Sequence, residues 1–161
     1  MNKIEKIIKN LNLSKHPEGG YYKRNYEASD WIVAPERFAE PRDRPVSTAI
    51  YYLLGAQDFS MWHRIKSDEL WHHYEGLPLK LSIFNQETGI VSESILGKVS
   101  EGFVPQIAIH QGLWFSAKPL VLTGPDSEDS ADYVLCGCTV SPGFNFKDFE
   151  LADSLFERGD R

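Results

Sequence analysis

Residues 60–76 read SMWHRIKSDELWHHYEG, and within them histidines and acidic residues alternate with apolar ones. The side chains of a β-strand point alternately to its two faces, so a strand over residues 61–65 places His63 on a face with apolar neighbours. A short polar turn follows, and residues 69–74 have the composition of a second strand. On that strand, Glu69 lies on a face that can oppose His63. The stretch therefore predicts a histidine and a carboxylate that meet inside a β-sheet protein.

Such a pair is suited to acid–base chemistry. An imidazole has an ordinary pKa of about 6.5, and a carboxylate that holds it in a dry interior prepares it to move protons at neutral pH. The alternative is a buried ion pair with a purely architectural role, but burying two charges costs free energy that apolar packing would not. We therefore predict that His63 and Glu69 are catalytic residues.

Other side chains are predicted to bind a ligand. Residues 46–54 read as a buried central strand. If its even-numbered side chains point inward, Tyr52 could serve as the acid that opposes His63, although Tyr51 is equally available. Gln106 lies in an apolar run, where a buried amide needs a hydrogen-bond partner. It is therefore expected to bond either to a ligand or to the facing strand.

Two tryptophans and one more histidine complete the ligand-binding candidates. Trp71 and Trp114 could line the mouth of a pocket and stack on a sugar or base, although aromatic residues in strands more often belong to the core. His73 is predicted to share the face of Trp71. His16 and Glu18 precede two glycines, and we expect them only to shape a turn.

Composition limits the classes to which this chain can belong. Its 161 residues are 42% hydrophobic and 25% charged, enough for one domain with a real core. A net charge of -6 disfavours nucleic acids and anionic membranes as partners, because both bind to basic surfaces. Residues 1–13 lack the apolar core of a signal peptide, and no stretch approaches the roughly 18 apolar residues of a membrane span. We expect a soluble, cytosolic protein.

Hydrophobic periodicity divides the chain into a helix, a set of strands and a second helix. Residues 1–13 repeat apolar side chains at helical spacing. Residues 20–140 contain short strands at regular intervals, which is typical of a sandwich or barrel. Asn145 followed by Asp148 is typical of a helix start, so a second helix is predicted over 145–157.

Residues 27–46 show neither a helical nor a strand period, and a loop of this length is usually functional or mobile. The forked donors of its arginines could bind a phosphate or a carboxylate in a pocket beneath the loop. The alternative is a solvated loop in which these arginines pair with neighbouring acids. We favour the second interpretation and assign no site to them. The residues concerned are Arg37, Arg42 and Arg44 with Glu36, Glu40 and Asp43.

The spacing around His63 resembles the first motif of the cupin superfamily, which reads H-x-H, three or four residues, E, six residues and G. His63, Glu69 and Gly76 match this motif, whereas Ile65 stands at the second histidine. Residues 110–115 resemble the second motif, P-x-G-x-x-H, in its glycine alone. Of the four metal ligands that are usual in the superfamily, the resemblance therefore retains an imidazole and a carboxylate.

Four longer blocks resemble the small cupin-five subfamily, whose members are mostly of unassigned function. They are HPEGGYY at 16–22, STAIYYLL at 47–54, HRIKSDELWH at 63–72 and CTVSPGFNFKDFELA at 138–152. The resemblance spans nearly the whole chain. It implies an all-β, single-domain cupin over residues 1–161, a double-stranded β-helix or jelly-roll barrel with short N- and C-terminal helices. Small barrels of this kind often pair, so a homodimer is expected.

The resemblance also bears on metal binding. A cupin with the full set of ligands binds a divalent metal such as iron, manganese, nickel or zinc. Ile65 and Phe115 occupy two of those positions here, and the two protein ligands that remain seldom hold a catalytic ion. We therefore expect no tightly bound metal and no other cofactor. If a divalent metal does bind, its expected ligands are His63, Glu69 and either His73 or, after a bulge, His72.

The metal-free cupins that this chain resembles in part are sugar-nucleotide epimerases, in which a histidine of the barrel takes a proton next to a carbonyl. The resemblance implies an enzyme of epimerase or isomerase type that acts on a small polar metabolite, such as a sugar or nucleotide derivative. One alternative is a non-catalytic barrel that binds or senses a small molecule. The other is a metal-dependent oxygenase or isomerase with a reduced ligand set.

Overall fold

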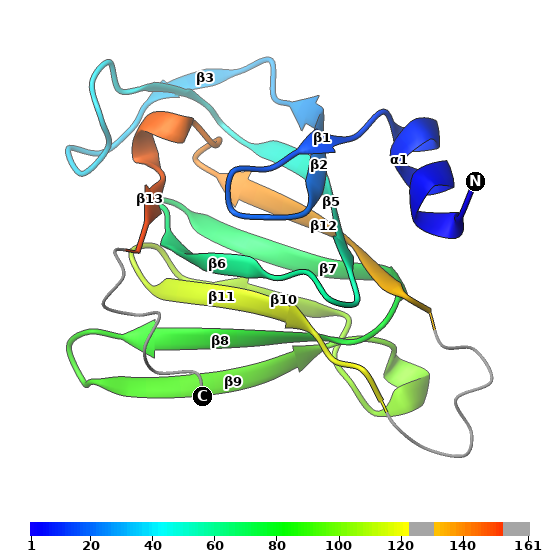
Figure 1. Ribbon diagram of the computed structural model, residues 1–161. Helices are drawn as coiled ribbons and strands as arrows, with labels where there is room; N and C mark the ends of the chain where they lie inside the picture. Colours follow the sequence, from blue (N-terminus) through cyan, green and yellow to red (C-terminus); the bar gives the residue numbers. More distant parts are fainter. Residues whose placement is uncertain (123–130, 153–161) are drawn as a thin grey trace.

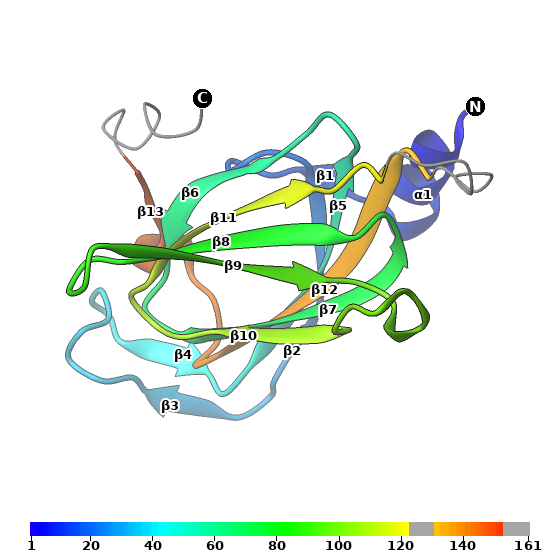
Figure 2. The same ribbon diagram turned by 90° about the horizontal axis from the view of Figure 1, so that it is seen from below.

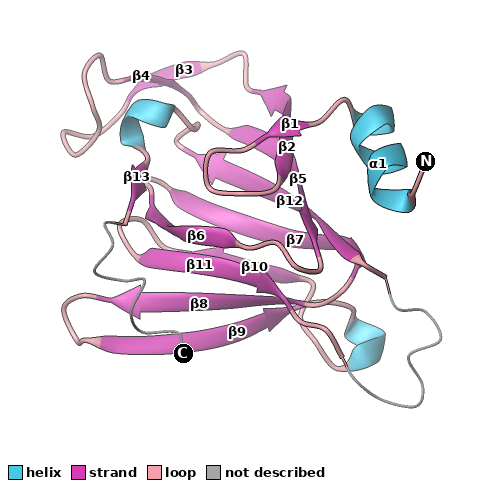
Figure 3. Ribbon diagram, viewed as in Figure 1, coloured by secondary structure: helices cyan, strands magenta, loops and turns pink. Residues whose placement is uncertain are grey.

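The computed structural model describes residues 1–122 and 131–152, and strands dominate them (Figure 1). The elements in chain order are α1 (Lys3–Leu11), β1 (Ser14–Lys15), β2 (Tyr21–Glu27), β3 (Trp31–Val33), β4 (Asp43–Pro45), β5 (Thr48–Gly55), β6 (Ser60–Arg64), β7 (Asp68–Gly76), β8 (Leu79–Asn85), β9 (Ile90–Leu96), η1 (Val99–Glu101), β10 (Gln106–Ile109), β11 (Trp114–Pro119), β12 (Tyr133–Ser141), η2 (Phe146–Asp148) and β13 (Glu150–Leu151). Figure 3 shows how little of the described chain is helical. None of its helices is long and apolar enough to cross a membrane.

The strands form two main antiparallel sheets around one apolar interior (Figure 2). The larger sheet has the order β1-β2-β5-β12-β7-β10 and the smaller the order β13-β6-β11-β8-β9, while β3 and β4 pair by themselves. Strands that are distant in the chain become neighbours, such as β5 with β12 and β12 with β7, which is typical of a jelly roll. The all-β barrel expected from the sequence is therefore confirmed.

Alternation along the central strands determines which side chains enter the interior. On β5, Tyr52 and Leu54 belong to the main core, and Leu53 on the opposite face packs beneath α1. Trp71 of β7 lies edge-on to Tyr52 and Phe115, with ring centroids 5.6 and 6.2 Å away. Since Tyr52 and Trp71 belong to the larger sheet and Phe115 to the smaller, these rings hold the two sheets together.

Helix α1 covers the outer side of the larger sheet and begins with a capping box. The Asn2 side chain accepts from the Glu5 N–H, and the Glu5 carboxylate accepts from the Asn2 N–H. The apolar stripe of the helix packs on Leu53 and Tyr133. The N-terminal helix expected from the periodicity is therefore present.

The C-terminal helix predicted over 145–157 is wrong for the residues that the structure describes. Asn145 does accept a hydrogen bond from the Lys147 N–H, as a helix cap would, but only one 3-10 turn follows before the chain enters β13. β13 pairs with β6, where Glu150 also forms a salt bridge. The backbone groups of this segment are thus satisfied by the sheet instead of by a helix. The rest of the predicted helix lies outside the described residues.

The segment 27–46, expected to be a loop, contains the small sheet of β3 and β4. Only Arg42 pairs as expected with an acid of the segment, Glu40, at 2.8 Å. Arg37 instead donates from Nε to a carbonyl oxygen beyond the segment, and Arg44 is buried. The solvated-loop interpretation is therefore wrong for Arg44, whereas Arg37 is exposed as expected but does not pair with an acid of the segment.

Arg44 joins this segment to the C-terminal turn η2 by a buried ion pair. Its Nε and Nη2 donate to the two carboxylate oxygens of Asp148 at 2.7 and 3.0 Å. The remaining hydrogens of Arg44 are donated to the carbonyl oxygens of Ala39, Pro41 and Asp43. Asp148 also accepts from the Ala39 N–H. Because these bonds satisfy both charged groups, the pair can stay buried and hold η2 in place.

The variant Asp148→Asn leaves the Arg44 guanidinium buried without its counter-charge. We expect it to lower the free energy of unfolding by about 3–5 kcal/mol, the usual cost of removing one partner of a buried ion pair. Glu40→Gln is the matched control, since it removes the exposed partner of Arg42 and should cost less than about 1 kcal/mol. Urea denaturation followed by tryptophan fluorescence measures both. Equal losses in the two variants would contradict the role given to the buried pair.

Candidate functional site

A cavity of about 520 Å³ opens at the end of the barrel where β5, β6, β7 and β12 approach the C-terminal turn η2. It is lined by Ser14, His16, Glu18, Tyr22, Lys23, Arg24, Thr48, Ile50, His63, Ile65, Glu69, Cys138, Val140, Phe144, Asn145, Phe146 and Phe149. The side chains of His16, Glu18, His63 and Glu69 are nearly buried. Four groups that can exchange protons therefore surround one space that is largely shielded from water.

Glu18 reaches the cavity because the loop of residues 16–20 folds against the barrel. Gly19 and Gly20 have φ angles of +113° and +72°, which glycine adopts far more readily than other residues. A Cβ atom on either glycine would collide with a backbone carbonyl oxygen of a neighbouring segment. The Met61 N–H donates to the Glu18 carbonyl oxygen at 2.9 Å and ties the loop to β6. The paired glycines thus allow the close approach that buries the Glu18 side chain.

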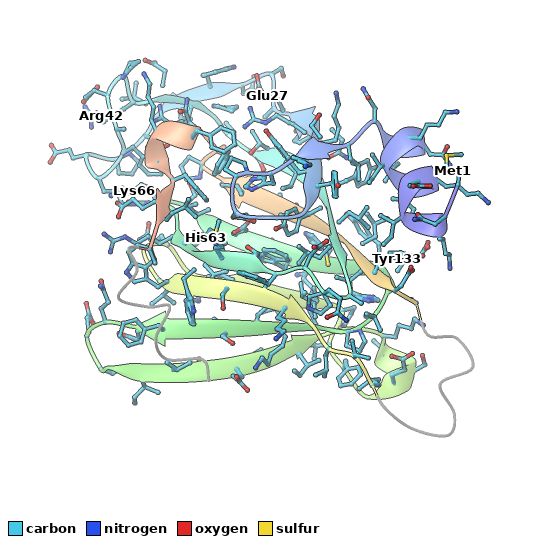
Figure 4. All side chains as sticks on the ribbon, viewed as in Figure 1. Met1, Glu27, Arg42, His63, Lys66 and Tyr133 are labelled. Atoms are coloured by element: carbon cyan, nitrogen blue, oxygen red, sulfur yellow. The ribbon has the colours of Figure 1, made fainter. Side chains whose placement is uncertain are left out.

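His63 lies on β6 with both ring nitrogens engaged, and Figure 4 labels it inside the barrel. Nδ1 is 2.7 Å from the carbonyl oxygen of Met61, which can only accept, so Nδ1 carries a hydrogen. Nε2 is 3.0 Å from Oε2 of Glu18. The ring packs against Phe115 and Phe149, whose centroids are 4.1 and 5.5 Å away. These contacts fix the ring, so that only Nε2 is available to exchange a proton.

Glu18 and His63 hold one proton between them. Since Nδ1 of His63 is already protonated, the contact at Nε2 is a hydrogen bond either from a protonated Glu18 or from an imidazolium. Burial raises the pKa of Glu18 to about 8, against the hydroxyls of Ser60 and Tyr52, which lower it. Burial also lowers the pKa of His63, against the charge of Glu69. Both shifts favour the neutral arrangement, in which Glu18 carries the proton.

Glu69 brings a second carboxyl group to the cavity from β7. The residue is 8% exposed, and its Oε2 has no hydrogen-bond partner among the residues that the structure describes. Burial raises the pKa of Glu69 to about 7, the charge of His63 lowers it, and the charge of Glu18 raises it further. A buried acceptor without a partner costs free energy, so this oxygen is ready to accept a hydrogen bond from a ligand.

His16 also lines the cavity. Its Nδ1 accepts from the Glu18 N–H at 3.1 Å, which leaves the single hydrogen of the neutral ring on Nε2. Burial, helped by the charge of His63, lowers the pKa of His16 to about 4. The ring also lies edge-on to Tyr22 at 4.5 Å. His16 is therefore a neutral hydrogen-bond donor at neutral pH.

The structure brings the predicted pair His63 and Glu69 to one cavity, but it gives His63 a different direct partner, Glu18. We had expected His16 and Glu18 only to shape a turn, so both were missed as residues of the site. A signal did exist, because both belong to HPEGGYY, one of the four blocks that carry the resemblance. Their approach to β6 depends on tertiary folding, which local spacing does not reveal.

Tyr52 and Trp71, predicted to bind a ligand, lie behind the cavity and not on its wall. The Tyr52 hydroxyl donates to the carbonyl oxygen of Gly19 at 2.7 Å and so supports the loop that carries Glu18. Burial and the charge of Glu18 raise the pKa of Tyr52 well above its ordinary value, so the hydroxyl keeps its hydrogen. Trp71 is 1% exposed in the core.

His72 and His73 also lie away from the cavity. β7 has one residue more than β12 at Tyr74, so the regular alternation of side chains ends there. The His73 ring donates from Nε2 to the carbonyl oxygen of Leu77 at 3.0 Å. On the other face of the strand, His72 is hydrogen-bonded to the Thr139 hydroxyl at 3.2 Å. Neither histidine joins His63 and Glu69 as a third ligand.

Gln106 and Trp114 complete the predicted ligand-binding residues, and neither lines the cavity. Gln106 begins β10, an edge strand of the larger sheet, and is exposed, so the prediction of a buried amide is wrong. The apolar composition of its neighbours did not reveal that one side of the strand is open. Trp114 is buried on β11, and the Arg64 guanidinium lies 4.6 Å from its ring centroid.

The side chains around the cavity do not fit a tightly held metal ion. Ile65 lines the cavity wall and Phe115 packs on the His63 ring, so two of the positions that hold ligands in metal-binding cupins are apolar. Nε2 of His63 is already bonded to Glu18. Within residues 1–122 and 131–152, no group of three or more candidate ligand side chains is placed to hold an ion.

A double-sheet jelly roll with a histidine and two carboxyl groups at one end of its interior is a cupin. More narrowly, the chain belongs to the family described as Cupin superfamily (DUF985), whose profile matches residues 5–152. The sequence matches none of the curated proteins.

Solved structures of two relatives are similar over nearly the whole chain. A protein from Shewanella oneidensis is 30% identical with a TM-score of 0.77, and the match covers 96% of this chain and 87% of that one. A hypothetical protein from Leishmania major is 31% identical with a TM-score of 0.78, over 95% and 89%. Oxalate decarboxylase from Bacillus subtilis is 12% identical with a TM-score of 0.59, over 94% of this chain and 32% of that one, and shows the fold alone.

The raised pKa of Glu69 predicts how stability depends on pH. Between pH 4.5 and about 7, the folded state keeps a proton that the unfolded state releases, so this group destabilises the fold as the pH rises. Glu69→Gln removes the effect, and its stability relative to wild type should increase over that range by an amount on the order of 3 kcal/mol. Urea denaturation at pH 5, 6 and 7 or thereabouts measures the difference.

Glu93→Gln is the matched control for this measurement, because it removes an exposed carboxyl group from β9. Its difference from wild type should change little with pH. A flat difference for Glu69→Gln as well would contradict the assignment of a proton to Glu69 in the folded protein.

Proposed function

We propose that the cavity is the active site of an isomerase or epimerase that transfers protons on a small polar metabolite without metal. Glu69 acts as the base, and the Glu18–His63 pair acts as the acid. The observation that carries this proposal is the 3.0 Å contact between Nε2 of His63 and Oε2 of Glu18, inside a cavity that Glu69 also lines.

The three groups divide the work because their surroundings differ. Glu69, with a pKa of about 7 and an oxygen free of hydrogen bonds within the described chain, can accept a proton near neutral pH. The Glu18–His63 pair holds one proton, which it can give to a substrate oxygen. A proton removed from a carbon next to a carbonyl would pass to Glu69, while the carbonyl oxygen receives the proton of the pair.

The walls of the cavity support a ligand with both polar and apolar parts. Its volume of about 520 Å³ suits a small metabolite. The rings of Tyr22 and Phe146 line the cavity with centroids 6.5 Å apart, and a sugar or base could pack on them. Lys23 and Arg24 also line the cavity, and the charge of Arg24 is paired with Glu27 at 2.9 Å. A sugar or nucleotide derivative that contains a carbonyl group fits this combination.

A non-catalytic barrel that binds or senses a small molecule is the second candidate. Oε2 of Glu69, which has no hydrogen-bond partner among the described residues, favours it, because that atom can recognise a ligand hydroxyl without removing any proton. The metal-dependent alternative has less support, since the side chains of the cavity do not fit an ion. The homodimer and the cytosolic location expected from the sequence stay predictions.

Hydrogen–deuterium exchange at carbon distinguishes catalysis from binding. The protein is incubated in D₂O with a panel of sugars, sugar phosphates and 2-keto acids, and mass spectrometry detects any compound that gains deuterium at a carbon. We expect at least one compound to exchange with wild type. Glu69→Gln and His63→Gln should slow this exchange by about a hundredfold or more, since each removes a group that transfers the proton.

His72→Gln is the matched control, because that histidine lies on β7 outside the cavity and bonds to Thr139. It should exchange deuterium at the wild-type rate. Undiminished exchange in His63→Gln would exclude the proposed role of His63. Saturable binding of a panel compound with no deuterium uptake by wild type would support the non-catalytic barrel instead.

A further inference from the structure

A second, smaller cavity of about 280 Å³ lies at the outer end of β6, beside the first. It is lined by Arg37, Arg64, Ile65, Lys66, Gln111, Gly112 and Asp148. Three of these side chains are cations, in a protein whose net charge is -6. Such a local excess of positive charge needs an explanation.

We propose that this second cavity binds a phosphate group, either as inorganic phosphate or as part of a phosphate ester. The proposal does not depend on the proton-transfer function of the larger cavity. It would stand even if that cavity only bound a ligand.

The three cations come from two parts of the fold. Arg64 ends β6 and Lys66 follows it in the turn before β7. Arg37 comes from the segment between β3 and β4, and its Nε donates to the Lys66 carbonyl oxygen at 2.9 Å. This bond anchors the Arg37 side chain at the cavity. Arginine forks and a lysine ammonium group are the side chains that most often bind phosphate oxygens.

The carboxylates nearby do not neutralise these cations. Glu150 serves two of them, at 2.8 Å from Arg64 and 3.5 Å from Lys66. Partial burial raises its pKa, but the hydrogen bond and charge of Arg64 lower it below its usual range, so Glu150 counts as one negative charge. Asp148 is fully occupied by Arg44. Asp68 adds a second carboxylate, which accepts from the Gln111 N–H at 2.8 Å. Among the described residues, the three cations therefore share the carboxylates of Glu150 and Asp68, and a bound phosphate would balance the remaining positive charge.

Arg37 has unused hydrogen-bonding capacity. Within the described part of the chain, its two terminal nitrogens donate no hydrogen bond, and the guanidinium lies 4.9 Å from the ring centroid of Phe38. A guanidinium that is anchored through Nε and open at both terminal nitrogens can present two parallel donors to an oxyanion. The sequence suggests phosphate binding by the arginines of the segment 27–46. The structure places one of them, Arg37, in a cavity with two other cations.

Titration of inorganic phosphate into the full-length protein tests the proposal. Isothermal calorimetry at low ionic strength should show one saturable site, and the amide NMR signals of Lys66 and Gly112 should shift. Arg37→Gln should weaken phosphate binding about tenfold, as expected when charged hydrogen bonds to the ligand are lost. Because Arg37 is exposed, the variant is expected to fold.

Arg42→Gln is the matched control, since it removes the same charge from the same segment but lies outside the cavity, where Figure 4 labels it at the edge of the molecule. It should weaken phosphate binding much less than Arg37→Gln does, because Arg42 donates no hydrogen bond in this cavity and its charge acts only from a distance. Equal weakening in both variants, or signal shifts at Lys23 and Arg24 instead, would overturn the proposal. So would the absence of saturation.

Glycerol 3-phosphate and acetate distinguish the possible forms of the ligand. Tighter binding of glycerol 3-phosphate than of inorganic phosphate would support an ester as the natural occupant. Equal affinity would support free phosphate. If acetate bound as tightly as phosphate, the site would be a general anion site, and the assignment to phosphate would be wrong.

Discussion

The burial of one carboxyl group, that of Glu18, determines the electrostatics of the candidate site. Its side chain would remain outside the barrel without the close approach that Gly19 and Gly20 permit. Once inside, it meets the only free nitrogen of His63, because the carbonyl oxygen of Met61 occupies the other. Desolvation then favours an uncharged pair that keeps a proton. The backbone conformations of Gly19 and Gly20 therefore lead to the shifted pKa values of Glu18 and His63.

The buried pair of Arg44 and Asp148 supports the same cavity from another direction. Asp148 lies in the C-terminal turn, beside Phe149, whose ring packs against His63. The ion pair fixes this turn to β4 in the segment 27–46, so the wall of the cavity is anchored by residues far from it in the chain. The smaller cavity borders the same turn and contains Arg37 from the same segment. The segment 27–46 thus stabilises the wall of the larger cavity through Arg44 without lining that cavity. Through Arg37 it also lines the smaller cavity.

Much of the architecture could be predicted because local patterns in the sequence determine it. The alternating strands and the apolar stripe of α1 follow from the period of hydrophobic residues. The period left open whether Tyr51 or Tyr52 points inward, and the structure places Tyr52 in the core. The candidate site was harder to predict, since contacts between distant segments create it. The spacing around His63 does not indicate that its direct partner is Glu18 and not Glu69. The C-terminal helix failed for a related reason: pairing of β13 with β6 outweighed a correct capping signal at Asn145.

The apolar core behind Trp71 limits how a ligand can enter and leave the barrel. Beyond this ring the interior is filled by side chains such as Leu79, Leu81 and Leu96, each with no exposed surface. A molecule that reaches Glu69 therefore cannot pass further into the interior, and it leaves through the opening by which it entered. Compounds that enter and compounds that leave would share that opening, so each would compete with the other for binding in the larger cavity.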